Sequence, residues 1–193
     1  MMLNIVLFGP PGAGKGTQSE KIIDKYHVTH ISTGDLFRNH LENGTELGKL
    51  AQQFMDKGNL VPDDVVIRMV ELKIKEKKGT AGFIFDGFPR TVNQAKALDR
   101  LLDDIGNPIS GMILLVVDEE ELKKRIMLRG KTSGRSDDQD EEKVNNRIRV
   151  YKDETLPVAE YYKQQNKLNQ VKGVGSIDDI FQKICETIDN LPR

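Results

Sequence analysis

The run Gly9–Thr17, with the sequence GPPGAGKGT, constrains the fold of this chain more than any other stretch. It follows the apolar run Leu3–Phe8 and leads into a helical pattern, so the expected order is strand, glycine loop, helix. Gly9, Gly14 and Lys15 match the phosphate-loop pattern G-x-x-x-x-G-K. Glycines let successive backbone N–H groups face one concavity, and the helix behind them adds its positive N-terminal end. The run therefore predicts a loop that binds phosphate groups rather than an ordinary glycine-rich turn.

The residue after Lys15 departs from the general pattern. Gly16 stands where Ser or Thr is usual, and the hydroxyl arrives one place later, at Thr17. This weakens a direct assignment of the usual contact between that hydroxyl and magnesium.

Composition limits the kinds of protein that this chain can be. The 193 residues are enough for one compact domain. Lys plus Arg number 29 and Asp plus Glu number 30, so no overall charge draws the chain to nucleic acid or to a membrane surface. The only cysteine, Cys185, excludes an internal disulfide and a cysteine metal cage. With neither a long apolar run nor a signal-peptide pattern, we expect a cytoplasmic protein, and nothing indicates more than a monomer.

Short apolar runs alternate with longer helical patterns along the chain. This alternation predicts an α/β fold, a doubly wound sheet of about five parallel strands flanked by helices. In such sheets ligands bind beyond the carboxyl ends of the strands, so the residues after each strand are the candidates for a site. The expected strands are Leu3–Phe8, Val28–Ile31, Gly82–Asp86, Gly111–Val117 and Leu168–Val171.

Polar segments follow the second and third expected strands. Ser32-x-x-Asp35 is a capping-box pattern, and two short helices should follow before a helix that begins near Pro62. Asp86 ends the third strand, where a carboxylate can either reach magnesium at the phosphate loop or accept backbone N–H groups. Thr91-x-x-Gln94 is a second capping-box pattern, so Gln94 can be a helix cap as well as a ligand contact.

Arginines recur in the segments expected at the ligand-facing edge. Singly, each is most simply a solvated surface charge, but together they indicate anion binding, because a protein of balanced charge does not need such a cluster for solubility. A polar loop is expected over residues 130–138, and a helix from about Gln139. Further on, an amphipathic C-terminal helix should bury Ile177, Ile180, Phe181, Ile184, Ile188 and Leu191, with Cys185 beside them. The arginines are Arg90, Arg125, Arg129, Arg135 and Arg147.

Several stretches together resemble the adenylate kinases, a family of nucleoside monophosphate kinases. The motifs that carry the resemblance are Gly9–Thr17, Ser32–Asp35, Phe85–Thr91 and the run Arg125–Arg147, and they cover nearly the whole chain. The string DGFPR at this distance from the phosphate loop is far more specific than the loop alone. The resemblance implies reversible, magnesium-dependent transfer of a phosphoryl group, in which ATP and AMP give two ADP and adenine nucleotides are kept in balance.

The resemblance also implies roles for individual residues. ATP contacts are expected from Gly12, Ala13, Gly14, Lys15, Gly16, Thr17, Arg125, Arg129 and Gly175. AMP contacts are expected from Thr33, Arg38, Asn59, Leu60, Val61, Gly87, Phe88, Pro89, Arg90, Gln94, Arg135 and Arg147. The residues expected to be catalytic, because they gather the phosphates, are Lys15, Arg90, Arg129, Arg135 and Arg147. Magnesium should arrive with ATP, and Thr17 and Asp86 are the residues that can reach it.

Two mobile parts are implied within a single kinase domain over residues 1–193. One is an AMP-binding flap over residues 32–61, and the other is a short lid over residues 128–138. Many bacterial members carry a longer lid, often with four cysteines that bind zinc. Only three residues separate Lys131 from Arg135 here, so the resemblance is to the short-lid type without zinc.

Two other functions compete with this interpretation. Kinases for UMP or CMP tend to have Ala where Thr33 stands and Asn where Thr91 stands, so both positions favour AMP. A GTP-dependent switch would read guanine with Asn-Lys-x-Asp, whereas the nearest string, at residues 166–169, ends in Asn169.

Overall fold

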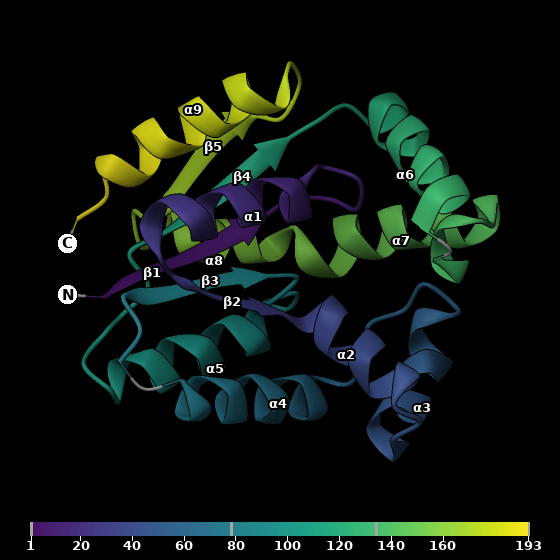
Figure 1. Cartoon of the computed structure of the whole chain (residues 1–193), viewed down its shortest axis with the longest axis horizontal. Helices are drawn as coiled ribbons and strands as arrows, with labels where there is room; N and C mark the ends of the chain where they lie inside the picture. Colours follow the sequence, from purple (N-terminus) through teal and green to yellow (C-terminus); the bar gives the residue numbers. More distant parts are fainter. Residues whose placement is uncertain (1, 78, 134, 193) are drawn as a thin grey trace.

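Five parallel strands form a single sheet in the order β2-β3-β1-β4-β5 (Figure 1). The computed structural model describes residues 2–77, 79–133 and 135–192. The predicted α/β fold with a doubly wound parallel sheet is confirmed, and each expected strand lies within one residue of its predicted bounds. The strands are β1 Leu3–Phe8, β2 Thr29–Ser32, β3 Gly82–Asp86, β4 Gly111–Val116 and β5 Leu168–Lys172.

Helices connect the strands and cover both faces of the sheet. Figure 1 shows α2, α3 and α6 beyond the carboxyl ends of the strands, on the side where ligands bind in such folds. The helices are α1 Lys15–Tyr26, α2 Thr33–Glu42, α3 Glu46–Met55, α4 Asp63–Glu76, α5 Val92–Asp103, α6 Glu119–Ser133, α7 Glu141–Val150, α8 Pro157–Lys163 and α9 Ile177–Asp189. A 3₁₀ turn, Ser136–Asp138, precedes α7, and a π-helical turn, Tyr151–Thr155, follows it.

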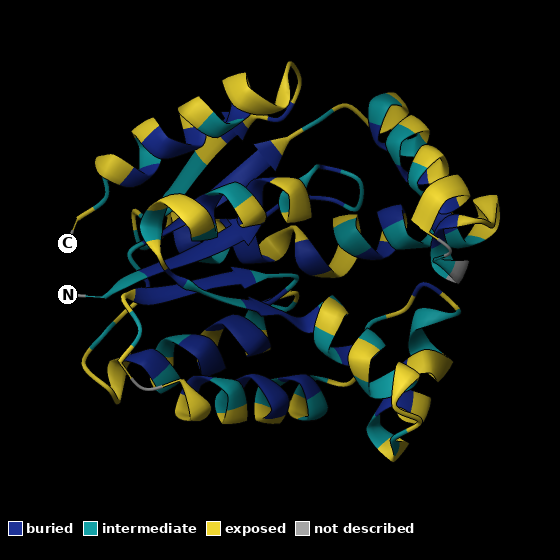
Figure 2. Cartoon of the chain, viewed as in Figure 1, coloured by how far each residue is buried: buried dark blue, intermediate teal, exposed yellow. Residues whose placement is uncertain are grey.

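Alternate residues of the strands face two separate apolar cores. On β1, Ile5 and Leu7 pack with residues of α1 and α9, whereas Val6 and Phe8 pack with residues of α4, α5 and α8. This is the period of two that a β-strand imposes, and it explains why β1 is apolar on both faces. Figure 2 shows β1, β3 and β4 largely buried, the edge strand β5 mostly intermediate or exposed, and the outer sides of the helices exposed.

Asn4 is the polar exception inside β1. Its side chain is fully buried, donates from Nδ2 to the Asn107 carbonyl (2.7 Å) and accepts at Oδ1 from the Phe83 N–H (3.0 Å). The amide thus joins β1 to β3 and to the segment before β4. Burial of a polar group is tolerated because both of its ends have partners.

The capping patterns read from the sequence begin helices as expected. Ser32, Thr91 and Ser176 each accept a hydrogen bond from the backbone N–H three residues later, at the starts of α2, α5 and α9. Two short helices, α2 and α3, occupy the excursion between β2 and α4, as predicted. They approach closely at Gly48, where an added Cβ would lie 2.4 Å from the backbone of α2.

Two local expectations were wrong. Residues 130–133 belong to α6 rather than to a loop. Gly130 does not end the helix; because it lacks a Cβ, the Asp138 carbonyl can lie 2.5 Å from where that atom would be. Gly134, which belonged to the same expected loop, lies outside the described residues. Ile177 is 51% exposed rather than inward, because it is the first residue of α9, before the helix turns its apolar face to the sheet.

Within the described ranges, none of the helices combines the length and the apolar character needed to cross a membrane.

Asn4→Ala should lower the free energy of unfolding by about 2 kcal/mol, because it leaves the buried Phe83 N–H and the Asn107 carbonyl without their partner. Urea unfolding measures this change. Asn39→Ala, at an exposed position within α2, is the control and should change stability by less than about 0.5 kcal/mol. Equal effects of the two substitutions would contradict the role given to Asn4.

Candidate active site

The carboxyl ends of β1, β2 and β3 border a cavity of about 520 Å³. Its lining includes the phosphate loop after β1, the start of α2 after β2 and the segment after β3. Every residue predicted to contact ATP or AMP lies on it except Gly175. These are Gly12, Ala13, Gly14, Lys15, Gly16, Thr17, Thr33, Arg38, Asn59, Leu60, Val61, Gly87, Phe88, Pro89, Arg90, Gln94, Arg125, Arg129, Arg135 and Arg147. Asp86, a residue predicted to reach magnesium, also borders the cavity.

The phosphate loop curls around the N-terminus of α1. Gly14 has φ +92°, a left-handed conformation that disfavours other residues, and α1 begins at Lys15. At Gly12 an added Cβ would lie 2.8 Å from Ile126 Cγ1, so this glycine allows the loop to touch α6. The Lys15 ammonium donates to the carbonyls of Gly9 (2.8 Å) and Pro10 (3.1 Å). The loop therefore presents backbone donors, a helix N-terminus and an ammonium group to the same space.

Lys15 lies where positive charge is concentrated. Burial, together with the charges of Arg90, Arg129 and Arg147, lowers its pKa from 10.5 to about 8, although Asp86 acts in the opposite direction. Burial and the nearby charge of Arg147 likewise lower the pKa of Arg90. A cavity that disfavours its own cations in this way is suited to receive an anion of high charge.

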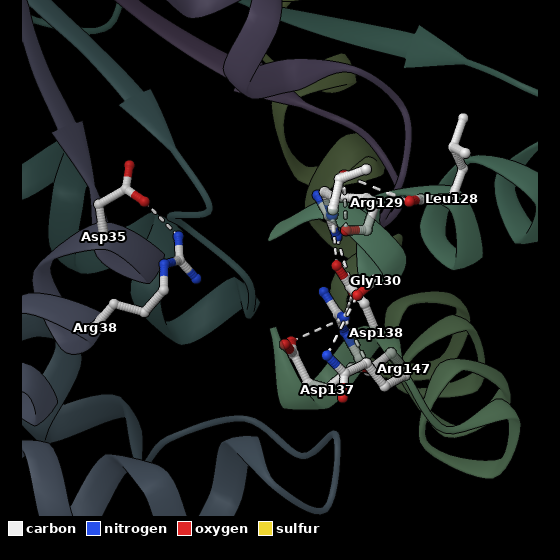
Figure 3. A network of polar contacts seen from close by, with 10 residues as sticks. Asp35, Arg38, Leu128, Arg129, Gly130, Asp137, Asp138 and Arg147 are labelled. Carbon is white, nitrogen blue, oxygen red and sulfur yellow. Dashed lines mark hydrogen bonds and ion pairs between the residues drawn. The ribbon is translucent and has the colours of Figure 1, made fainter. Parts of the chain in front are cut away.

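A buried carboxylate holds two of the predicted arginines together (Figure 3). Asp138 accepts from Arg129 Nε (2.6 Å) and Nη2 (2.9 Å), and from Arg147 Nη1 (2.5 Å). Asp137 also lies 2.8 Å from Arg147. The network ties α6, the 3₁₀ turn and α7 together, and each guanidinium has five N–H donors, so donors remain for the cavity.

Asp138 stays ionised in this network. Its side chain has no exposed surface, and burial alone would raise the pKa of its carboxyl. The hydrogen bonds and charges of Arg129 and Arg147 outweigh burial and lower the pKa below its ordinary value. A charge that is buried in this way is stable only while its partners remain in place.

The opposite wall of the cavity is built around the Gly87 carbonyl. It accepts from Thr33 Oγ1 (2.8 Å) and from Arg90 Nε (2.7 Å). Gly87 has φ +74°, and an added Cβ would lie 3.0 Å from Arg90 and 3.1 Å from the Thr33 hydroxyl. Arg38 pairs with Asp35 on the same side, and Figure 3 shows this pair across from the Asp138 network.

Gln94 is buried with 1% of its surface exposed, although it borders the cavity. Its backbone N–H donates to Thr91 Oγ1 (3.1 Å), so Thr91 caps α5 as predicted. Its side-chain Oε1 accepts from the Arg90 N–H (2.7 Å), and Nε2 donates to Asp63 Oδ1 (2.8 Å).

Two oxygen-bearing residues near the phosphate loop fit a magnesium ion. Asp86 and Thr17 both border the cavity, and magnesium is usually held by one or two protein oxygens together with substrate phosphates and water. His30 Nε2 lies 3.8 Å from Asp86 Oδ2, so the carboxylate is not enclosed by a strong partner on that side. Among the described side chains, no three of His, Cys, Asp or Glu come together as a metal-binding group.

The sequence interpretation missed three acidic residues at this site. Asp137 and Asp138 directly follow Arg135 and Ser136, and that adjacency of charges is the only local sign of their pairing with arginines. Asp63 gives no local sign, because its partners are about 30 residues away in the chain. Gly175, which does not line the cavity, lies in the segment between β5 and α9.

Replacing Lys15 with Met should change how stability depends on pH. The unfolded chain keeps the Lys15 proton up to about pH 10.5, whereas the folded chain releases it near pH 8, so the native protein gains stability relative to Lys15→Met across this window. The gain should reach up to about 3 kcal/mol. Urea unfolding at pH 7, 9 and 10.5 measures it, with Lys49→Met at an exposed position as the control. A difference between native protein and Lys15→Met that stays constant with pH would contradict the burial argument.

Comparison with known proteins agrees with the geometry of the cavity. The family model described as "Adenylate kinase" matches residues 7–167. The chain is 53% identical over 190 residues to the adenylate kinase of Flavobacterium johnsoniae, which covers 98% of this chain and all of that protein. It is 48% identical over 190 residues to the adenylate kinase of Bacteroides thetaiotaomicron, with the same coverage. The Azobacteroides pseudotrichonymphae adenylate kinase is 46% identical over 192 residues and covers the whole of both chains.

These relatives decide between the functions left open by the sequence. AMP, rather than UMP or CMP, is the acceptor, and the activity is the conversion of ATP and AMP to two ADP. The site and the comparisons agree, and the chain belongs to the adenylate kinase family.

Proposed function

We propose that the cavity holds ATP on the phosphate-loop side and AMP on the Thr33–Gly87 side, so that their phosphates meet among the arginines. The observation that carries this proposal is the single cavity bordered at once by Lys15, Arg90, Arg129, Arg135 and Arg147. Phosphoryl transfer needs positioning and neutralisation of charge rather than a protein nucleophile. A ring of cations around one space supplies both.

The ATP side is formed by residues 12–17 together with Arg125. The N–H groups of the loop and the N-terminus of α1 hold the phosphates, and Lys15 follows the transferred group as a mobile charge. Arg125 donates to Glu121 (2.7 Å) and to the Gly173 carbonyl (3.0 Å). This contact supports a place for the adenine beside Arg125, with the segment around Gly175 at its edge.

The AMP side takes residues from three places in the chain. Thr33 and Arg38 come from α2, the Asn59–Val61 segment comes from the end of the flap, and Gly87–Arg90 follow β3. Arg90 and Arg38 are placed for the AMP phosphate, and Gln94 is placed for the base. Charged hydrogen bonds of this kind contribute about 1.5–3 kcal/mol each, so each arginine is worth one to two orders of magnitude in rate.

Thr17 and Asp86 would hold the magnesium ion that enters with ATP, either directly or through its water. When bound, the ion neutralises negative charge on the phosphate oxygens. The charge of Asp86 also raises the pKa of Lys15 and so offsets part of the lowering that burial causes.

Two parts of the domain would move around the bound nucleotides, the flap of residues 32–61 and the lid of residues 128–138. Closure would exclude water, so that the phosphoryl group passes to AMP and not to water. Within the lid, Asp138 orients Arg129 and Arg147 toward the cavity. The protein would work as a monomeric single domain in the cytoplasm.

Gln94→Ala should raise KM for AMP about tenfold or more, because a buried amide that contacts the base is lost. KM for ATP should stay within about twofold, since ATP is held at the other side of the cavity. Steady-state kinetics with each substrate varied in turn measures both constants. Equal effects on AMP and ATP would leave Gln94 with its capping role alone.

Lys15→Met should lower kcat at least about 100-fold, because the charge that follows the transferred phosphate is removed. The folded structure should remain, as judged by circular dichroism. Lys49→Met, at an exposed position outside the cavity lining, serves as the control with parent activity. Activity within a few-fold of the parent would show that Lys15 does not contact the transferred phosphate.

A further inference from the structure

We propose that Asp63 is a positioning residue that fixes the Gln94 amide in one orientation and thereby makes the acceptor site select adenine over guanine. This inference rests on the proposed contact between Gln94 and the base of AMP. Asp63 has no assigned role in the site described above, and it does not border the cavity.

Asp63 accepts hydrogen bonds from three side chains at the start of α5. Its Oδ2 accepts from Thr91 Oγ1 (2.9 Å) and from Asn93 Nδ2 (3.0 Å), and its Oδ1 accepts from Gln94 Nε2 (2.8 Å). Asp63 is the first residue of α4, where the positive end of the helix favours a carboxylate. A carboxylate has about four acceptor sites, so three donors leave it well satisfied.

The two neighbours of the Gln94 side chain allow only one orientation of the amide. The Asp63 carboxylate can only accept, so it requires the NH2 group of Gln94, and the Arg90 N–H can only donate, so it requires Oε1. A turned amide would place oxygen against carboxylate and NH2 against N–H. Both hydrogen bonds would be lost at a position with 1% exposure, where water offers little compensation.

After these two bonds, the amide keeps one N–H and one lone pair for the cavity. At C6, adenine carries an amino donor and guanine a carbonyl acceptor, so the two bases need opposite ends of an amide at the same place. An amide that could turn would accept either base. An amide fixed by Asp63 and by the Arg90 N–H matches one base and leaves polar groups unpaired against the other, a mismatch that discriminates strongly.

Asp63→Asn tests this role with almost no change in shape. The asparagine side chain has a single oxygen. This oxygen cannot accept from Gln94 and from the Thr91 and Asn93 side chains at the same time, so Gln94 is no longer bound to a fixed acceptor. Asp64→Asn is the matched control, because Asp64 is the next residue of the same first turn and is exposed. Both substitutions remove one negative charge from the N-terminus of α4.

Kinetics with ATP, AMP and GMP provide the readout. Asp63→Asn should raise KM for AMP about tenfold and reduce the AMP-to-GMP ratio of kcat/KM about tenfold, with KM for ATP within about twofold. Asp64→Asn should leave all three values near those of the parent. The same Asp63→Asn change in a Gln94→Ala background should have no further effect on AMP, because Asp63 acts through Gln94.

Three results would overturn the proposal. In Asp63→Asn, KM for AMP and KM for ATP could rise together, or the AMP-to-GMP ratio of kcat/KM could stay unchanged. In the Gln94→Ala background, Asp63→Asn could raise KM for AMP as much as it does in the parent protein. If Gln94→Ala leaves KM for AMP unchanged, the proposed contact between Gln94 and the base is wrong, and this inference is wrong with it. If Gln94→Ala raises KM for AMP but Asp63→Asn does not, only the role of Asp63 is wrong. Asp63→Ser replaces Asp63→Asn if thermal unfolding shows the latter to be unfolded, with the same expected result.

Discussion

Repulsion among cations in one cavity is the constraint that the rest of the site has to offset. Burial lowers the pKa of Lys15 most, and the charges of Arg90, Arg129 and Arg147 lower it further. Carboxylates on both walls of the cavity offset this positive charge. The charge of Asp86 acts on Lys15, and Asp138 pairs with both Arg129 and Arg147. On the other wall, Asp35 pairs with Arg38. The cavity thereby keeps a dense positive field that two nucleotides, rich in phosphate, can neutralise.

Local sequence patterns predicted the fold and most of the lining of the site. The strands could be predicted because apolar runs of a few residues are sufficient to define a buried parallel sheet. The phosphate loop could be predicted because its glycines and lysine lie within a few residues of one another. The arginine cluster was readable because the parallel sheet brings every segment that follows a strand to the same edge.

The remaining contacts depend on residues that are distant in the chain. Asp63 meets Gln94 only because α4 and the start of α5 lie side by side, and no pattern within either helix requires that contact. The sequence predicts a loop from residue 130, but Gly130 lies within α6, where its missing Cβ leaves room for the Asp138 carbonyl, eight residues further along the chain. Gln94 illustrates the same limit. The capping pattern predicts only that its backbone N–H donates to Thr91, whereas its side chain bonds Asp63 and the Arg90 N–H and borders the cavity.

The proposed placement of ATP and AMP in one cavity predicts that ATP turnover depends on the acceptor. The most direct test follows ADP formation from magnesium-ATP with AMP, GMP, CMP or UMP, and with no acceptor. We expect turnover with AMP to exceed turnover without an acceptor by at least about 100-fold, and to exceed turnover with each other monophosphate strongly. ATP consumption that is equally fast without AMP would mean that the cavity serves hydrolysis, and it would contradict the placement of two nucleotides around Lys15 and the arginines.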